Sequence, residues 1–233
     1  AELIEALADS YHHVGLDDTI VVTRSNKRAN IFNQGIRNMV LDREEELSQG
    51  DILMIVKNNY YWMEEERKKL SEERRVKSEE TEFGGRRESQ FNCLANHKVQ
   101  SSNLKVPSND IPAFLANGDR AKVLKVRRRI DLYGFRFATL LLQFPDYGNY
   151  ELEATVLLDT LTSEAPALTH EQQEQLFHQI EEDYQDVPLK ADRMKAIRQD
   201  QFYNALQVKF AYAVTCHKAQ GGQWAHVYVD QGY

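Results

Sequence analysis

The chain has 233 residues, of which 42% are hydrophobic and 28% are charged, and its formal net charge at pH 7 is -7. This length and composition allow one large domain or two small domains with hydrophobic cores. The negative charge argues against a protein that coats nucleic acid through bulk charge, so any such contact must be local. No apolar run reaches the roughly 18 residues of a membrane-spanning helix, and the N-terminus has no signal-peptide pattern.

The cysteine and histidine positions predict neither a disulfide framework nor a metal site. Cys93 and Cys216 are far apart in the sequence, and the adjacent His12 and His13 do not converge on one point. We therefore expect a reducing, cytoplasmic location without membrane attachment. Because Ala1 stands where an initiator Met would stand, we also expect the chain to be part of a longer protein.

The first 48 residues alternate between helix and strand patterns. Apolar residues at helical spacing predict a helix over residues 2–13, and the β-branched run at residues 18–23 predicts a buried strand. A second helix is expected after the following polar turn, with Ser25 or Asn26 as its cap. A strand, a polar turn and a helix form an α/β unit, in which ligands meet the loop after the strand.

A different pattern begins at Gly50. Short strand patterns are separated by turn residues such as Asn117-Gly118-Asp119, and they are expected at residues 51–58, 121–130 and 136–144. Several short strands with turns between them predict a small antiparallel barrel inserted into the α/β domain. The residues at about 63–109 fit neither pattern, because much of this segment is a dense mixture of Glu, Lys and Arg. We expect it to be an insertion that forms either a solvated helix or a mobile arm.

Charge is unevenly distributed along the second half of the chain. Residues 120–136 contain seven Lys or Arg and one acidic residue, whereas residues 150–187 contain ten Asp or Glu and no Lys or Arg. The basic stretch is either a phosphate-binding surface or the solvated face of a strand.

Two more elements are expected after residue 150. Thr169 and Gln172 predict a capping box at the start of a helix that runs to about residue 184. Residues 207–215 are apolar on both faces after Lys209, which predicts a central strand of a covered sheet. Residues 227–229 predict one more strand.

The most informative segment is AYAVTCHKAQGGQWAHVYVD, at residues 211–230. A buried strand is followed by Thr215 as a helix cap. Three polar residues are then expected in one short helical turn that ends at Gly221-Gly222: His217, Lys218 and Gln220. A helix N-terminus offers free N–H groups and the positive end of a dipole, which suits a phosphate. Taken alone, the same pattern is also typical of an ordinary connection after a strand.

The order of residues in this segment resembles a known motif. Thr-x-His-Lys-x-Gln-Gly, after an apolar strand and before Val-x-Val-Asp, is similar to the fifth conserved motif of superfamily 1 helicases. It is most similar to the RecD-like branch, which includes the alpha subunit of ATP-dependent exodeoxyribonucleases. In that family the motif lies in the second RecA-like motor domain, contacts the single-stranded DNA backbone and couples it to the nucleotide cleft.

The resemblance implies roles for individual residues of this chain. It places four residues on DNA: Thr215, His217, Lys218 and Gln220. Gly221 allows close approach of the chain on the nucleotide side. The family usually has a Glu near the nucleotide ribose, where this chain has Gln223, whose amide can also form a hydrogen bond.

Two further segments agree with this resemblance. Residues 19–30 resemble the fourth motif of the family, in which an Arg after a strand faces the ATP phosphates, and Arg24 is the matching residue. The alternative is that Arg24 is an ordinary exposed loop residue. The expected barrel is similar to the SH3-like insert of the RecD-like branch, which touches single-stranded DNA.

One element of an ATPase is absent from the sequence. It contains no Gly-x-x-x-x-Gly-Lys-Ser/Thr loop to hold the β- and γ-phosphates, and it ends before the sixth motif of the family. The resemblance therefore implies that ATP and Mg²⁺ are cofactors of the complete protein and that neither is bound by this chain alone. We expect the isolated chain neither to hydrolyse ATP nor to unwind DNA.

Together these observations predict an α/β fold, namely a partial RecA-like second motor domain of the P-loop NTPase type with an inserted SH3-like β-barrel. The expected parts are residues 1–48 and 151–233 for the motor domain and residues 49–150 for the barrel. The expected function is that of the C-terminal part of an ATP-dependent DNA helicase or translocase. Its expected partners are single-stranded DNA, the missing N-terminal motor domain and possible nuclease subunits. The alternative is a non-catalytic SH3-like module that binds nucleic acid or protein through the basic strand at residues 127–129.

Overall fold

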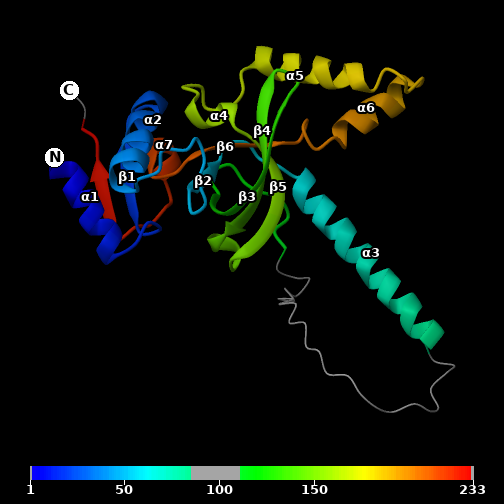
Figure 1. Ribbon diagram of the computed structural model, residues 1–233, viewed down its shortest axis with the longest axis horizontal. Coiled ribbons are helices and arrows are strands. Elements are labelled where there is room, and N and C mark those ends of the chain that lie inside the picture. Colours follow the sequence, from blue (N-terminus) through cyan, green and yellow to red (C-terminus); the bar gives the residue numbers. More distant parts are fainter. Residues whose placement is uncertain (1, 85–110, 232–233) are drawn as a thin grey trace.

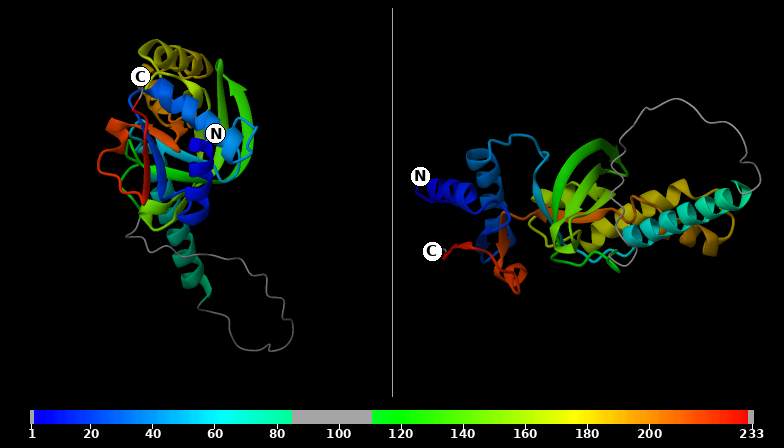
Figure 2. Two further views of the ribbon diagram at one scale, coloured as in Figure 1. Left: turned by 90° about the vertical axis from the view of Figure 1, so that its left-hand side faces the viewer. Right: turned by 90° about the horizontal axis from the view of Figure 1, so that it is seen from below.

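The structure is a computed structural model that describes residues 2–84 and 111–231. It contains a three-stranded sheet and a closed five-stranded barrel that lie next to each other (Figure 1). Both ends of the chain lie beside the sheet, and the long helix α3 (Tyr61–Gly84) projects away from the barrel (Figure 1 and Figure 2). The expected charged insertion begins within α3, and its remainder at residues 85–109 lies outside the described residues.

The α/β part is built from the two ends of the chain. Its elements are α1 (Glu2–His13), β1 (Thr19–Thr23), α2 (Asn26–Gly35), the π-helix η1 (Ile36–Val40), β7 (Ala213–Thr215), α7 (Cys216–Ala219) and β8 (His226–Val229). The strands lie in the order β7-β1-β8, and both pairings are parallel. The predicted N-terminal helix, the buried strand and the helix that follows it are therefore confirmed.

The sheet and α2 are tied together by polar side chains as well as by apolar packing. The Ser25 hydroxyl accepts a hydrogen bond from the Arg28 backbone N–H at 3.2 Å, which caps the start of α2 as predicted. Further along the helix, the buried Asn33 side chain accepts from the Ala213 N–H at 2.7 Å and donates to the carbonyls of Phe210 and Ala213. These bonds satisfy the backbone at the point where the chain enters β7.

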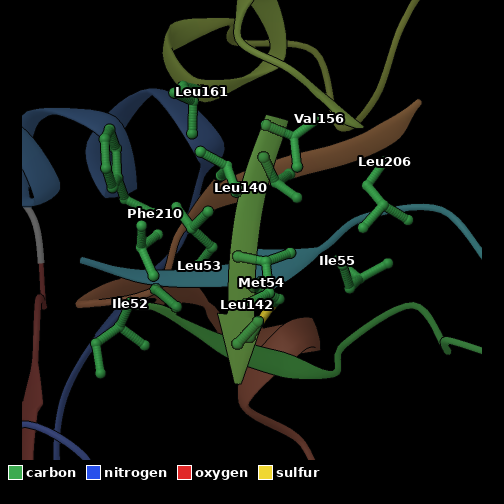
Figure 3. Packing of buried hydrophobic residues seen from close by; sticks show 14 of the residues in the cluster. Ile52, Leu53, Met54, Ile55, Leu140, Leu142, Val156, Leu161, Leu206 and Phe210 are labelled. Atoms are coloured by element: carbon green, nitrogen blue, oxygen red, sulfur yellow. The ribbon is translucent and has the colours of Figure 1, made fainter. Parts of the chain in front are cut away.

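The barrel closes in the order β2-β3-β4-β5-β6. Its strands are β2 (Ile52–Ile55), β3 (Arg120–Leu132), β4 (Phe135–Phe144), β5 (Tyr150–Leu157) and β6 (Leu206–Phe210), and the short helix η2 (Pro145–Tyr147) joins β4 to β5. Neighbouring strands are antiparallel except for β5 and β6, which pair in parallel. Alternate side chains of β4 point inward, and Leu140 and Leu142 meet Leu53 and Val156 in the barrel core (Figure 3).

Two predictions about the second half of the chain are wrong. The barrel was expected to end at residue 150, but it includes β5 and β6 and so continues to Phe210. Residues 207–215 were expected to form one central strand, but they belong to two strands, β6 in the barrel and β7 in the sheet. The chain turns between them at Ala211, whose N–H donates to the Ile52 carbonyl at 2.9 Å.

The remaining helices gather on one side of the barrel (Figure 1). They are α4 (Asp159–Thr162), α5 (His170–Asp183) and α6 (Lys190–Arg198). The capping box predicted for α5 is confirmed, because Thr169 and Gln172 each accept a hydrogen bond from the other's backbone N–H. In the described part of the chain, none of the helices combines the length and the apolar character needed to cross a membrane.

A buried ionic cluster joins the sheet to the barrel. We call it the Asp51 cluster, and it consists of Arg37, Arg43, Asp51 and Tyr212. The Asp51 carboxylate is fully buried and accepts hydrogen bonds from both guanidinium groups, from the Tyr212 hydroxyl at 2.8 Å and from the Ser48 N–H at 2.7 Å. Burial raises the pKa of Tyr212 above its ordinary value, which keeps its hydroxyl a donor. The chain passes from the sheet to the barrel just before β2 and returns between β6 and β7. The Asp51 cluster ties these two connections together.

Candidate nucleic-acid interface

Two polar loops leave the sheet side by side at its carboxyl edge. The parallel register pairs Thr23 of β1 with Thr215 of β7, so Arg24 and Cys216 begin neighbouring loops. The Thr23 hydroxyl donates to the Val214 carbonyl at 3.3 Å, and the Cys216 thiol donates to the Thr23 carbonyl at 3.1 Å. The carboxyl edge of a parallel sheet is where α/β proteins bind their ligands.

The loop after β7 has a different local geometry from the predicted one. We call residues 215–224 the 215–224 loop. Thr215 occupies the cap position of α7, but its side chain forms no capping bond in the described structure. Gln220 was expected within the helical turn, but it has an extended backbone, and Gly221 follows with φ 86°. The short helix therefore ends at Ala219, and a β-turn follows in which the Gly222 N–H donates to the Ala219 carbonyl at 3.1 Å and Gly221 supplies the positive φ.

The 215–224 loop is on the surface. His217, Gln220 and Gln223 are exposed, and Lys218 and Thr215 are partly buried. This placement agrees with a loop that meets an external ligand.

One pocket at this edge brings the two loops together. It has a volume of about 520 Å³, and its lining includes Arg24, Lys27, Thr215, His217 and Lys218. Three of the lining residues are cations, and Glu164 is the one carboxylate in the lining. Lys27 lies 3.8 Å from Glu164, and both side chains are largely exposed, so water screens this pair. We call this the cationic pocket, and its charge is opposite to the net charge of the chain.

A second pocket lies on the barrel side of the same loop. Its volume is about 570 Å³, and it is lined by Gly221 and Gln223 together with Asn117 and Arg120 of the barrel. We call it the barrel-side pocket. Arg24, Gly221 and Gln223 were all expected to face the nucleotide, but the structure does not bring them together, because Arg24 lines the cationic pocket and the other two line this one.

Lys218 is the residue that links the two pockets. With His217, it lines both of them, and its ammonium group donates a hydrogen bond to the Asn117 side-chain oxygen. Burial lowers the pKa of Lys218 below its ordinary value. An ammonium group has three donors, so Asn117 orients it and still leaves donors for an anion.

Trp224 anchors the 215–224 loop to the rest of the protein. The Arg120 guanidinium lies 5.8 Å from the centre of the Trp224 ring, which is within reach of a cation–π interaction. A side chain at position 222 would place its Cβ only 2.1 Å from a Trp224 ring atom, so Gly222 is needed for this close packing. Trp224 is partly buried and packs against the main core.

Sequence reasoning missed Asn117 and Arg120 as members of the site. Asn117 was identified only as a turn residue, and Arg120 only as part of a basic stretch. Both reach the 215–224 loop because the turn after residue 115 is pinned to β2, with Gly118 donating to the Ile55 carbonyl and Ile55 donating to the Asp119 carbonyl. Local sequence patterns do not predict that this turn pairs with β2.

Lys209 lies in a small cavity that adjoins the cationic pocket. The cavity has a volume of about 30 Å³, and Lys218 and Thr215 also line it. The Lys209 ammonium donates to the carbonyls of Thr160 at 3.1 Å and Ser163 at 2.5 Å. These bonds anchor the segment that carries Glu164 into the wall of the cationic pocket. Burial lowers the pKa of Lys209 to about 8.

This lowered pKa predicts a stability change at alkaline pH. Between the folded pKa of about 8 and the ordinary value of 10.5, the unfolded chain binds the Lys209 proton more strongly than the folded chain. The contribution of Lys209 to the free energy of unfolding therefore rises with pH in this window. Urea unfolding from pH 7 to pH 10 should show that wild type gains stability relative to Lys209→Met. The comparison isolates Lys209, because the tyrosines that ionise in this range are present in both proteins. Parallel pH profiles would show that Lys209 has an ordinary pKa.

The basic strand at residues 127–129 offers a weaker anion-binding surface than its sequence suggested. Arg127 lies 3.2 Å from Glu153, and Arg129 lies 3.3 Å from Glu45. Carboxylates next to these guanidinium groups reduce the positive potential that a phosphate would meet.

Comparison with known families points to the same loop. Residues 210–233 match the family model of the UvrD-like helicase C-terminal domain, and this segment includes β7, α7, β8 and the whole 215–224 loop. No curated protein matches the chain. The matched segment supports a superfamily 1 helicase and a helicase-related, DNA-binding function for this chain.

Proposed function

We propose that the chain is part of the second motor domain of an ATP-dependent DNA helicase or translocase of superfamily 1. The observation that carries this proposal is the cationic pocket at the carboxyl edge of β1 and β7. Arg24, Lys27 and Lys218 line one pocket in a chain with a net charge of -7, and the family match covers the loop that contributes Lys218.

In this proposal the 215–224 loop holds the backbone of single-stranded DNA. Thr215, His217, Lys218 and Gln220 supply hydroxyl, imidazole, ammonium and amide groups, all of which bind phosphate oxygens. Contacts to phosphates carry no sequence information, so binding is independent of base sequence and sensitive to salt. Asn117 fixes the Lys218 ammonium from the barrel side.

The nucleotide side of the proposal rests on Arg24. Its exposed guanidinium lies next to the 215–224 loop, where it suits a phosphate of ATP. The sequence contains no Gly-x-x-x-x-Gly-Lys-Ser/Thr loop to hold the β- and γ-phosphates. We assign that loop and the Mg²⁺ ligands to a separate N-terminal motor domain. The chain alone then neither hydrolyses ATP nor unwinds DNA.

The barrel favours the RecD-like branch within this superfamily. It is inserted between the α2 region and β7, so the chain leaves the sheet before β2 and returns to it after β6. Nuclease subunits, if the complete protein has them, are partners outside this chain. The alternative of a non-catalytic binding module is disfavoured because the family match covers residues 210–233 and does not include its proposed contact strand at residues 127–129.

The test is a salt titration of single-strand binding by the purified chain. Fluorescence anisotropy with labelled oligo(dT) should give an association constant whose logarithm falls linearly with the logarithm of salt concentration. For about three phosphate contacts, the slope should be on the order of -2. A mixed-sequence oligonucleotide of equal length should bind equally well. Absence of binding at low salt, or a strong base preference, would contradict the proposal.

A further inference from the structure

A third pocket lies across the barrel from the sheet, and none of the roles described so far involves it. It has a volume of about 230 Å³ and is formed by the segment after β2, by α5 and by the segment before β6. Its lining includes Lys57 and the tyrosines Tyr60, Tyr61 and Tyr203, and we call it the tyrosine pocket. None of its lining residues is acidic, although the chain contains 36 Asp and Glu.

The aromatic walls of this pocket are exposed but held in place. The relative exposure is 53% for Tyr60 and 41% for Tyr203, which is high for such large side chains. Tyr60 stacks on Phe114 with ring centres 4.8 Å apart, and Tyr203 meets Phe177 edge to face at 6.2 Å. Aromatic rings that are fixed on one side and accessible to solvent form stacking platforms for bases.

Hydrogen bonds also fix the backbone around the pocket. The Asn59 side chain and the Trp62 indole N–H both donate to the Asn204 carbonyl at 2.9 Å, which sets the position of the neighbouring Tyr203. Amide side chains line the interior, among them Gln173, whose oxygen accepts from the Lys57 ammonium at 3.3 Å. A rigid pocket with aromatic walls, amide groups and one cation is suited to a planar polar ring attached to an anion.

A polar connection runs from this pocket to the 215–224 loop. Asn58 lines the tyrosine pocket, and its side-chain oxygen accepts from the Asn117 N–H at 2.7 Å. Asn117 in turn accepts from Lys218 and lines the barrel-side pocket. The groups that would hold a DNA backbone at Lys218 are therefore continuous with the rim of the tyrosine pocket.

We infer that the tyrosine pocket binds one unstacked base of the single strand whose backbone is held by the 215–224 loop. The base stacks on the Tyr60 and Tyr203 rings, and Lys57 contacts its phosphate. This inference rests on the proposed function, because it takes the loop as the first contact with DNA. The volume of the pocket admits a single base, and its amide groups accept any base edge without selecting one.

The experiment compares two lengths of oligo(dT), about 4 and about 12 nucleotides, on wild type, Tyr203→Ala and Tyr203→Phe. Tyr203→Ala should weaken binding of the long oligonucleotide on the order of tenfold and leave the short one unchanged. Tyr203→Phe keeps the ring and should bind as wild type does. Leu189→Ala removes a similarly exposed apolar side chain elsewhere, with a relative exposure of 64%, and should change neither affinity.

Other results separate the two claims. One such result is that Tyr203→Ala binds the long oligonucleotide as tightly as wild type does, while Lys218→Ala loses binding of the short one. That result would overturn the pocket assignment and leave the proposed function intact. An equal loss for both lengths would also overturn it, because the pocket would not be a separate contact. Failure of wild type to bind either length would reject the proposed function itself. If the protein bound an aromatic peptide and Tyr203→Ala did not change its affinity for DNA, the pocket would be a protein-docking site.

Discussion

Replacing Lys218 with Ala is expected to weaken binding of single-stranded DNA on the order of tenfold or more. Its ammonium group lines both pockets of the 215–224 loop, and a hydrogen bond between two charged groups is stronger than one between neutral groups. Loss of one phosphate contact should also reduce the magnitude of the salt slope by about 0.7. Fluorescence anisotropy with oligo(dT) at several salt concentrations measures both quantities.

A matched control separates a specific contact from a change in net charge. Lys190→Ala removes the same charge from an exposed position at the start of α6, away from the sheet edge. It should leave the affinity near that of wild type. Equal losses in the two variants would mean that the protein attracts DNA only through its overall charge, and Lys218 would have no special role.

Replacing Asp51 with Asn is expected to lower the free energy of unfolding by about 3–5 kcal/mol. The substitution preserves side-chain shape but removes the charge that compensates Arg37, whose side chain is only 2% exposed, and Arg43. A buried guanidinium without its carboxylate is costly, because water can no longer solvate it. Urea unfolding followed by circular dichroism measures the change.

The control for Asp51 is an ion pair of the same kind on the surface. Glu45 lies 3.3 Å from Arg129, and both side chains are well exposed, so Glu45→Gln should change stability by less than about 1 kcal/mol. If Asp51→Asn were as mild as Glu45→Gln, the Asp51 cluster would not be what holds the sheet against the barrel.

Local patterns in the sequence were sufficient for the elements that are specified by their own residues. The strand at β1, the Ser25 cap of α2 and the capping box at Thr169 depend on neighbours within a few positions, and all three are present. The barrel was also predicted, because turn residues separate its strands. Such signals require no knowledge of distant contacts.

Features that depend on distant residues were not predictable in the same way. The apolar run at residues 207–215 does not reveal where the chain leaves the barrel, since β6 and β7 are both buried. The turn between them is set by hydrogen bonds that Ala211 and Ala213 donate to Ile52 and Asn33. These acceptors are more than 150 positions away in the sequence. A pattern of burial predicts that a strand is covered on both faces, but it does not identify the sheet that covers it.

The candidate site shows the same division. The order of Thr215, His217 and Lys218 was visible in the sequence, and the parallel register of β1 and β7 brings Arg24 next to them. The contribution of the barrel was not visible, because Asn117 reaches Lys218 only after β2 and β3 have paired. Gln220 was misplaced because the helix ends one residue earlier than the spacing suggested, and Gln220 lies in the β-turn that follows.

Hydrogen exchange with and without oligo(dT) is the most direct measurement of where the chain holds DNA. We expect protection of backbone amides at residues 215–221, with little change along the basic strand at residues 127–129. Protection of that strand, with unchanged exchange at the carboxyl edge of β1 and β7, would show that DNA binds elsewhere and would contradict the proposed role of the sheet edge.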